Sequence, residues 1–198
     1  MAWNASLNPP TTDTTRAGER TAAEGTLRIR RWVLGDIPAI RRITLAAWRD
    51  AYGSFIPEED LQDYFGSHFS RVVLETGMVS PDVHGYVAED SGSAVGWMRL
   101  RWDPTVRRCS MTSLYVLPRH QGRGMGARLL EMAERCAQGH GVDELWVGVM
   151  GQNAAALAWY RRRGFVVSDD GPFTMGKTTV MLCLCVKQLA EKGAEDGR

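Results

Sequence analysis

The chain has 198 residues, which is long enough for one good-sized domain and short for two. Hydrophobic residues make up 44% of it and charged residues 24%, the composition of an ordinary globular protein. The 24 Lys and Arg residues against 23 Asp and Glu give a formal net charge of +1. This balance argues against a protein that coats nucleic acid, which needs a strong basic excess, but it leaves room for a local basic patch around a phosphate.

The first 25 residues are rich in Thr, Pro, Gly and Ala and show neither a helical nor a strand period. We expect residues 1–25 to form a flexible tail and residues 26–190 to form the single domain. The tail lacks the long apolar core of a secretory signal, and no run of about 18 apolar residues indicates a membrane span. The four cysteines form no C-x-x-C pair and no zinc-spaced cluster with histidine. The protein is therefore expected to be cytoplasmic, without a metal site and without membrane or nucleic-acid partners.

The first structured segment is a strand followed by two helical stretches. Residues 26–33 alternate between two faces, which predicts the strand. Asp36 is a suitable helix N-cap, and the helix that follows should end near Tyr52. A second helical stretch covers residues 58–77, and we expect it to break near Gly66 and Ser67.

Three strands with short connections come next, at residues 84–90, 94–103 and 109–118. The SGS sequence between the first two indicates a β-hairpin, and the short connections imply antiparallel pairing. Residues 124–137 then show the period of an amphipathic helix. Its buried stripe is expected to consist of Leu129, Met132, Ala133 and Cys136.

The last part of the chain alternates strands with helices. Residues 144–150 predict a strand and residues 153–164 a helix, and two further strands follow at 165–170 and 177–187. The order is therefore β-α-α-β-β-β-α-β-α-β-β, without an internal repeat. The two strand–helix–strand units imply parallel neighbours, so the sequence predicts a mixed α/β sheet of seven strands.

The stretch RHQGRGMGARLL, residues 119–130, places three glycines at alternate positions before a helical pattern. The first N–H groups of a helix lack partners inside the helix, and that end carries about half a positive charge. A turn without Cβ atoms lets these N–H groups close around an anion such as a pyrophosphate. Arg119, Arg123 and Arg128 add positive charge. A tight turn that binds nothing remains the alternative, and the absence of GKS or GKT argues against a P-loop.

A dinucleotide-binding loop is a second possibility for the same glycines. Gly122, Gly124 and Ala127 satisfy the G-x-G-x-x-A fingerprint, and Glu144 lies about 20 residues further on, where an acid would bind a ribose. Such a loop normally follows its strand directly, whereas four residues intervene here. It also normally opens a doubly wound sheet, whereas three antiparallel strands are expected before this one. A dinucleotide-dependent oxidoreductase therefore remains as a third choice.

The later helix carries two polar side chains that could address a ligand. Asn153 and Tyr160 are about two full turns apart, so both project from the same face of the helix. An amide and a phenol on one face could both contact one long polar molecule. The alternative is that Asn153 caps the helix and Tyr160 packs in the core.

Taken together, the two blocks resemble the GCN5-related N-acetyltransferase (GNAT) superfamily. The glycine block is similar to its [Q/R]-x-x-G-x-[G/A] motif, and the segment NAAALAWYRRRGF is similar to its N-x-x-A-x-x-x-Y pattern with the usual G-F after it. The resemblance covers about residues 109–166, and the pairing of the two motifs is more specific than either alone. The matching positions are Gln121, Gly124, Gly126, Asn153, Ala156, Tyr160, Gly164 and Phe165.

The resemblance implies both a fold and a co-substrate. The fold is a mixed, mostly antiparallel sheet of about seven strands flanked by helices on both sides. The co-substrate is acetyl-CoA, whose pyrophosphate would lie in the glycine loop and whose pantetheine arm would pair with the strand before it. The residues expected to contact acetyl-CoA are Leu114, Tyr115, Val116, Gln121, Gly122, Arg123, Gly124, Met125, Gly126, Ala127, Asn153, Ala156 and Tyr160.

The resemblance also implies the reaction. An amine would attack the thioester directly in a ternary complex, while a backbone N–H of the strand at 109–118 polarises the carbonyl, an effect worth roughly 10²–10³ in rate. Tyr160 resembles the general acid of the family, a role worth roughly 10²–10⁴. No carboxylate lies in the CSMTS segment to act as the general base. A water relay or an acid such as Glu89 could serve, and an amine of low pKa needs no base.

The acceptor is expected to be a primary amine of a small molecule or a peptide. In the family the first two helices shape the acceptor pocket, and here they carry several aromatic residues that could line it or form the core. These residues are Trp48, Tyr52, Phe55, Tyr64 and Phe65.

Two questions stay open at the level of the sequence. The missing carboxylate leaves a non-catalytic acyl-CoA-binding sensor or interaction module as the alternative function. The apolar run VMLCLCV near the C-terminus could pair with another subunit, which would make a homodimer, or lie inside one sheet.

Overall fold

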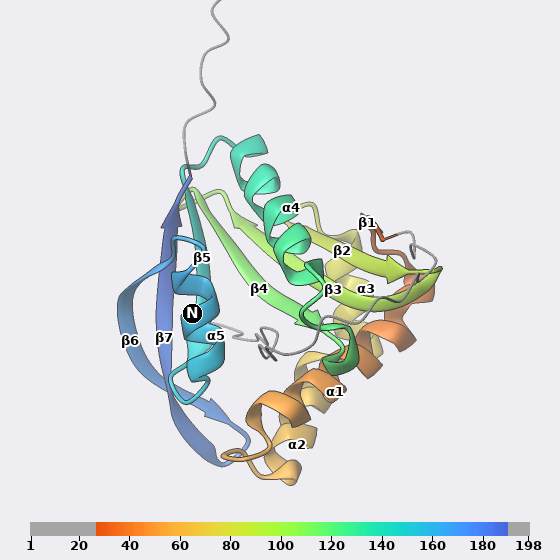
Figure 1. Cartoon of the computed structure of the whole chain (residues 1–198), viewed down its shortest axis with the longest axis vertical. Coiled ribbons are helices and arrows are strands. Elements are labelled where there is room, and N and C mark those ends of the chain that lie inside the picture. The colour runs from red at the N-terminus through yellow and green to blue at the C-terminus, as the bar shows by residue number, and fades with distance from the viewer. Residues whose placement is uncertain (1–26, 190–198) are drawn as a thin grey trace, which may run out of the picture.

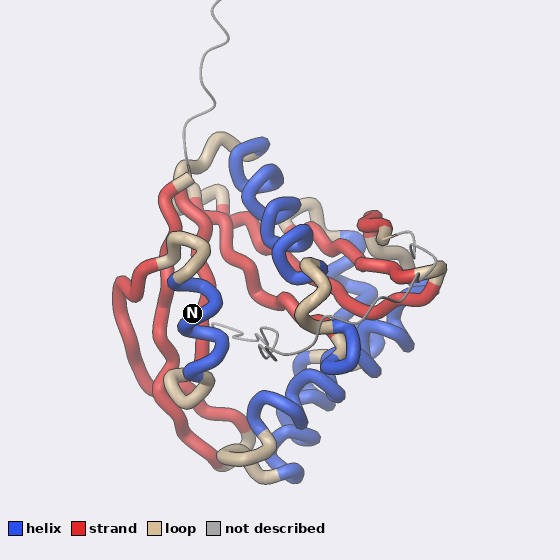
Figure 2. Tube along the Cα trace, in the orientation of Figure 1, coloured by secondary structure: helices blue, strands red, loops and turns tan. Residues whose placement is uncertain are grey.

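A computed structural model describes residues 27–189 and shows one seven-stranded sheet with the strand order β1-β2-β3-β4-β5-β7-β6 (Figures 1 and 2). The predicted tail, residues 1–25, lies outside the described residues. The strands are β1 Arg28–Arg31, β2 Val83–Asp90, β3 Ser93–Asp103, β4 Arg108–Val116, β5 Glu144–Met150, β6 Val166–Met175 and β7 Thr178–Gln188. The helices are α1 Ile37–Tyr52, α2 Glu58–His68, α3 Arg71–Val79, α4 Met125–Gly139 and α5 Ala154–Arg161. Two 3₁₀ turns, Leu34–Asp36 and Pro118–His120, precede α1 and α4.

Helices cover both faces of the sheet, as predicted. On one face, the indole of Trp48 in α1 donates a hydrogen bond to the hydroxyl of Tyr115 in β4, at 2.6 Å. On the other face, the side chain of Leu114 approaches Gly126 in the first turn of α4. Because successive residues of a strand point to opposite faces, α1 and α4 lie on opposite sides of β4. The mixed, mostly antiparallel α/β architecture is therefore confirmed.

The expected parallel pairing is half correct. β4 and β5 are parallel neighbours, but β7 lies between β5 and β6 and pairs antiparallel with both. The second strand–helix–strand unit therefore does not place its strands side by side. The reason is the burial of the two strands: β7 carries a continuous apolar run over residues 180–186 that suits a central position, whereas residues 166–170 of β6 are all exposed and suit an edge.

The helical stretch 58–77 breaks later than predicted. Gly66 stays inside α2, and the break falls at Phe69 and Ser70. Phe69 is fully buried and packs edge-on against Trp48, with ring centroids 5.1 Å apart. The hydroxyl of Ser70 accepts a hydrogen bond from the N–H of Val73 and starts α3. The position of the break thus follows a buried ring and a cap rather than the glycine.

The buried stripe of α4 is rotated by one position from the prediction. Leu129 and Ala133 are buried as expected, but Met132 and Cys136 are only half-buried. The hydroxyl of Tyr86 on β2 lies 3.2 Å from the sulfur of Cys136 at the edge of the interface. The contact of α4 with β3 and β4 is centred instead on Leu129, Leu130, Ala133 and Ala137.

Candidate active site

The sheet opens between β4 and β5. The two strands pair only from Cys109 to Met111, opposite Leu145 to Val147, within the described part of the chain. Beyond Met111, β4 remains paired with β3 and β5 with β7, and the two strands separate toward the lower part of Figure 2. The register between β3 and β4 shifts at this point and leaves Thr112 as an extra residue in β4. This β-bulge bends β4 away from β5.

The predicted residues of β4 lie beyond this point. Leu114, Tyr115 and Val116 are all buried, and their side chains belong to the hydrophobic core. The carbonyl of Val116 already accepts a hydrogen bond from the side-chain amide of Gln121, at 3.2 Å. This bond ties the glycine loop to the end of β4, so the structure brings these two predicted elements together.

The glycine loop leads directly into α4, as the sequence predicts. Gly122 and Gly124 have φ values of +76° and +78°, a left-handed conformation that other residues rarely adopt. No described atom lies within 4 Å of the position that a Cβ would take at either residue, so the loop is open on this side. Gly126 has a different role, because its Cβ would lie 3.4 Å from the ring of Trp159 in α5. That glycine allows the two helices to pack closely.

The N-terminus of α4 lacks a side-chain cap. The hydroxyl of Ser70 caps α3 and the amide of Asn153 caps α5, but no side chain among residues 27–189 accepts a hydrogen bond from the first turn of α4. The N–H groups of Met125, Gly126 and Ala127 therefore have no acceptor within the helix. Together with the helix dipole, they form a site suited to an anion.

The positive charge around the loop is partly neutralised by an acidic side chain. Asp90 at the end of β2 lies 3.8 Å from Arg123 and 3.4 Å from His120. The side chain of Arg123 is 63% exposed, so it remains free to approach a phosphate. Arg161 and Arg162 at the end of α5 are exposed, whereas Arg163 packs over the ring of Trp159 at 4.1 Å.

Tyr160 is buried with its hydroxyl unsatisfied. Its ring packs edge-on against Trp159 and Phe165, with centroids 4.8 and 5.1 Å away. The hydroxyl is sealed from solvent and has no hydrogen-bond partner among residues 27–189. A buried polar group without a partner costs free energy, roughly 1–3 kcal/mol, and commonly marks a place where a ligand atom binds. Burial also raises the pKa of Tyr160 well above the ordinary value of a phenol.

Asn153 and Ala156 start α5 next to Tyr160. The side-chain oxygen of Asn153 accepts a hydrogen bond from the N–H of Ala156, at 3.0 Å, so Asn153 caps the helix. Ala156 is fully buried. The capping alternative considered for Asn153 is therefore correct, and its contact with a co-substrate stays a prediction.

A cavity of about 670 Å³ lies between α2 and the β6–β7 hairpin. Tyr64 and His68, which stack with ring centroids 3.8 Å apart, form part of the α2 wall, and Phe173 on β6 faces them. Of the aromatic residues that the sequence singled out, Tyr64 lines this cavity, whereas Trp48, Tyr52 and Phe65 are core residues.

The β6 wall of the cavity was not predicted from the sequence. It includes residues 169–174, and the remaining lining residues are Asp63, Ser67, Gly176, Leu182 and Leu184. The side chain of Asp60 at the start of α2 holds the two walls together. It accepts hydrogen bonds from the N–H of Lys177, at 2.8 Å, and from the hydroxyl of Thr178, at 2.6 Å. The only local signal for this wall is the polar SDDG segment, which by itself also fits a solvent-exposed turn.

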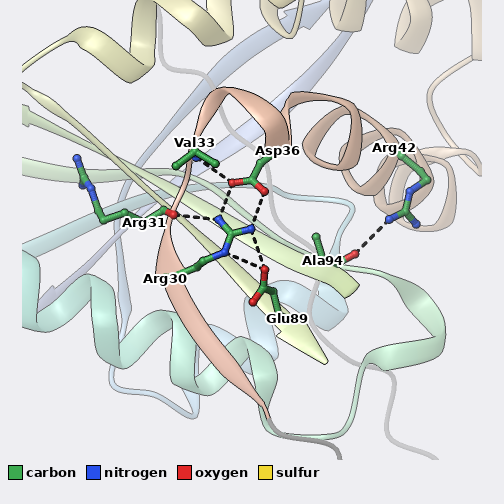
Figure 3. Close-up of polar contacts among 7 residues, drawn as sticks. All are labelled: Arg30, Arg31, Val33, Asp36, Arg42, Glu89 and Ala94. Carbon is green, nitrogen blue, oxygen red and sulfur yellow. Dashed lines mark hydrogen bonds and ion pairs between the residues drawn. The ribbon is translucent and has the colours of Figure 1, made fainter. Parts of the chain in front are cut away.

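Glu89, one of the acids considered as a general base, is engaged elsewhere. Figure 3 shows its carboxylate against the guanidinium of Arg30, which also holds Asp36. The N–O distances from Arg30 to each acid are 2.7 Å. Glu89 is absent from the cavity lining, and β4 carries no carboxylate. Within residues 27–189 no group of three or more His, Cys, Asp or Glu side chains could hold a metal ion, and no helix there is long and apolar enough to cross a membrane.

Comparisons with known proteins agree with this fold. The profile of the Acetyltransferase (GNAT) family matches residues 39–165. The IAA acetyltransferase of Azospirillum brasilense is 30% identical over 127 residues, covering 63% of this chain and 82% of that protein. The PaiA N-acetyltransferase of Thermoplasma acidophilum, solved in complex with coenzyme A, superposes with a TM-score of 0.73 at 20% identity, over 82% of this chain and 99% of its own. YncA of Salmonella typhimurium, solved with acetyl-CoA, gives a TM-score of 0.59 at 22% identity, over 87% and 99%.

Proposed function

Because the chain belongs to the Acetyltransferase (GNAT) family and is an acetyl-CoA-dependent N-acetyltransferase, we propose that it acetylates a primary amine of a small molecule or a peptide by direct attack in a ternary complex. The observation that carries this proposal is a pair of unsatisfied polar groups on two helices that pack together, since Gly126 of α4 lies against the ring of Trp159 of α5. One is the uncapped, glycine-bounded N-terminus of α4, and the other is the buried hydroxyl of Tyr160.

The described residues suit two parts of acetyl-CoA, its pyrophosphate and its pantetheine arm. The free N–H groups at the start of α4 suit its pyrophosphate, and the open space at Gly122 and Gly124 leaves room for it. The part of β4 that pairs with β3 but has separated from β5, from Leu114 to Val116, suits the amide groups of the pantetheine arm. Gln121, Arg123, Met125, Gly126 and Ala127 complete the loop, and Asn153 and Ala156 lie at the start of the next helix.

The proposed chemistry needs one proton donor. Acetyl-CoA supplies an acetyl group activated as a thioester. A neutral amine forms the new C–N bond as the C–S bond breaks, and the amine loses one proton while the sulfur gains one. Tyr160 holds a proton at its hydroxyl throughout the neutral range, because burial raises its pKa. A phenol that stays protonated is suited to act as the general acid.

β4 carries no carboxylate that could accept the proton lost by the amine. We therefore propose that an amine already neutral at working pH attacks directly, or that water takes its proton. The cavity between α2 and the β6–β7 hairpin is the proposed acceptor pocket, since Tyr64 on its wall packs against Trp48, which in turn contacts Tyr115 of β4.

The substitution Tyr160→Phe tests the proposal. With an accepted amine, kcat should fall about 10²-fold or more, while the Kd for acetyl-CoA stays within about twofold, because only the proton donor is removed. The melting temperature should not fall, since the lost hydroxyl has no partner among residues 27–189. Release of free CoA and isothermal titration give the two constants.

Tyr86→Phe is the matched control. It also removes a phenolic hydroxyl, but that hydroxyl contacts Cys136 of α4. The substitution should therefore leave kcat unchanged. An unaltered kcat in Tyr160→Phe would remove Tyr160 from the acid role. Binding of acetyl-CoA without transfer to any amine would instead support the non-catalytic binding module.

A further inference from the structure

Arg99 is a half-buried cation that the proposed chemistry does not use. It lies in the middle of β3, and its guanidinium carbon is 5.3 Å from the ring centre of Phe69 and 5.9 Å from that of Trp97. Its Nε donates a hydrogen bond to the hydroxyl of Thr112, at 3.1 Å. The side chain therefore points into the space between the sheet and the helices α1 and α2.

No carboxylate in residues 27–189 forms an ion pair with Arg99. Burial lowers the pKa of Arg99 to about 10, so the group stays charged at neutral pH although it is largely desolvated. Buried arginines are normally paired, because an isolated charge in the interior is costly. The aromatic rings compensate only part of this cost.

The two terminal nitrogens of Arg99 are available to donate hydrogen bonds. The hydroxyl of Thr112 accepts a hydrogen bond from Nε, whereas Nη1 and Nη2 donate none to other residues of the described chain. The side chain is only half-buried, so a small molecule can still reach it. Two parallel N–H groups in a rigid plane are the arrangement that binds a carboxylate in a bidentate manner.

The position of Arg99 connects the two parts of the proposed site. Its partner Thr112 immediately follows Met111, the last residue of β4 that pairs with β5. On the other side, Arg99 interacts electrostatically with Tyr64, which lines the cavity at α2. The guanidinium therefore lies between the cavity and the segment of β4 where the acetyl group is proposed to be held.

We propose that Arg99 binds a carboxylate of the acceptor, so that the substrates are amino acids or related small amines with a carboxylate close to the amine. This inference rests on the proposed function and adds the substrate class. The acidic residues that line the cavity are Asp63, Asp169 and Asp170, all exposed, and neither Lys nor Arg lines it. Arg99 lies beyond this lining, within electrostatic reach of Tyr64 on the α2 wall, so an acceptor carboxylate would extend past the cavity to Arg99 while the three carboxylates favour a neutral or cationic remainder.

The test compares amines that differ only by the carboxylate. Each amino acid is paired with its decarboxylated amine, such as phenylalanine with phenethylamine and histidine with histamine, and CoA release is followed with acetyl-CoA in excess. In at least one pair, the amino acid should have a kcat/KM about 30-fold higher or more, mainly through KM, the effect expected for a buried charge pair. Arg99→Met should abolish this preference.

Arg101→Met is the control, because Arg101 lies on the same strand and is exposed. It should keep the preference of the wild-type protein. The melting temperature separates binding from a structural role. Arg99→Met should melt at or above the wild type without ligand, since it removes an uncompensated charge. A purely structural Arg99 would instead lower the melting temperature and weaken both members of every pair equally.

Two further results would overturn the inference while leaving the proposed function standing. One is acetylation of amines with no preference for the carboxylate in any pair. The other, if no amine of the panel turns over, is the absence of any rise in melting temperature when the amino acids are added to the CoA-saturated protein, compared with their decarboxylated partners. Failure of acetyl-CoA itself to bind, measured separately by titration, would instead reject the proposed function.

Discussion

Gly124 and Gly141 lie at the two ends of α4 and share a left-handed backbone, with φ values of +78° and +67°. They differ in their surroundings. Gly124 borders the open loop, whereas Gly141 follows the C-terminal end of the helix and has the side chain of Arg107 at 3.9 Å from its Cβ position. Substitutions at the two glycines can therefore be compared. Both should introduce backbone strain, but only Gly124 is proposed to lie next to a ligand.

Gly124→Ala should weaken acetyl-CoA binding at least tenfold, because a methyl group would enter the space proposed for the pyrophosphate. Each substitution should also destabilise the fold by about 1–2 kcal/mol through left-handed strain. Gly141→Ala should show the strain alone, with an unchanged Kd. Titration calorimetry and thermal melts of both variants check this. Equal affinity of the two variants would mean that the loop does not hold the co-substrate.

Single residues differ in how far the sequence revealed them. The glycines and Tyr160 can be identified from the sequence because the spacing of two motifs carries the signal, and the structure shows left-handed glycines before α4 and an unpartnered Tyr160 hydroxyl among the described residues. Arg99 was not identified, because one arginine in an alternating strand looks like any surface residue. Its burial depends on the bulge at Thr112 and on the ring of Phe69, and the sequence shows neither contact.

At the scale of elements, β1 and the start of α1 are joined by the cluster shown in Figure 3. Arg30 binds Asp36 through both terminal nitrogens, at 2.7 Å each, and the N–H of Val33 donates to the same carboxylate at 2.8 Å. Burial alone would raise the pKa of Asp36, but the hydrogen bonds from Arg30 and Val33 outweigh it and lower the pKa below its ordinary value. The folded state therefore binds the Asp36 proton less tightly than the unfolded state.

This shift predicts a loss of stability in acid. A carboxyl with a lowered pKa stabilises the fold fully above its unfolded pKa and loses that contribution as the pH falls toward its folded pKa. Asp36→Asn should lower the free energy of unfolding at pH 7 by about 1–3 kcal/mol and make its decline between about pH 5 and 3 shallower. Urea unfolding at several pH values measures both.

The exposed helix pair of Arg71 and Glu75 provides the control. Glu75→Gln should change the free energy of unfolding by about 0.5 kcal/mol or less at pH 7, because solvent screens this pair. If the free energy of unfolding declined in acid equally steeply for the wild type and for Asp36→Asn, Asp36 would not be the group that titrates.

Local sequence patterns predict where the strands and helices lie more readily than they predict which strands pair in the sheet. The strand at 144–150 and the hairpin around SGS match β5, β2 and β3 closely, because turn residues and alternation act within a few positions. The insertion of β7 between β5 and β6 depends on which strand has two apolar faces to bury, a long-range property. For the same reason the β6 wall of the cavity was missed.

At the scale of the whole molecule, the sheet consists of two parts, β1 to β4 and β5 with β7 and β6. Within the described chain, they are joined in the sheet by the short parallel pairing of β4 with β5. The glycine loop and α4 follow the first part, and α5 with Tyr160 belongs to the second. We propose that the co-substrate is held by both parts and bridges the opening between them, which would account for the joint occurrence of the two sequence motifs.

Isothermal titration of the full-length protein with acetyl-CoA, and with NADH in parallel, tests this arrangement most directly. We predict micromolar binding of acetyl-CoA and no binding of NADH. Saturating acetyl-CoA, at about 100 times its Kd, should add about 2.7 kcal/mol to the free energy of unfolding. Binding of NADH alone would show that the glycines form a dinucleotide loop, and binding of neither ligand would contradict a co-substrate site at the N-terminus of α4.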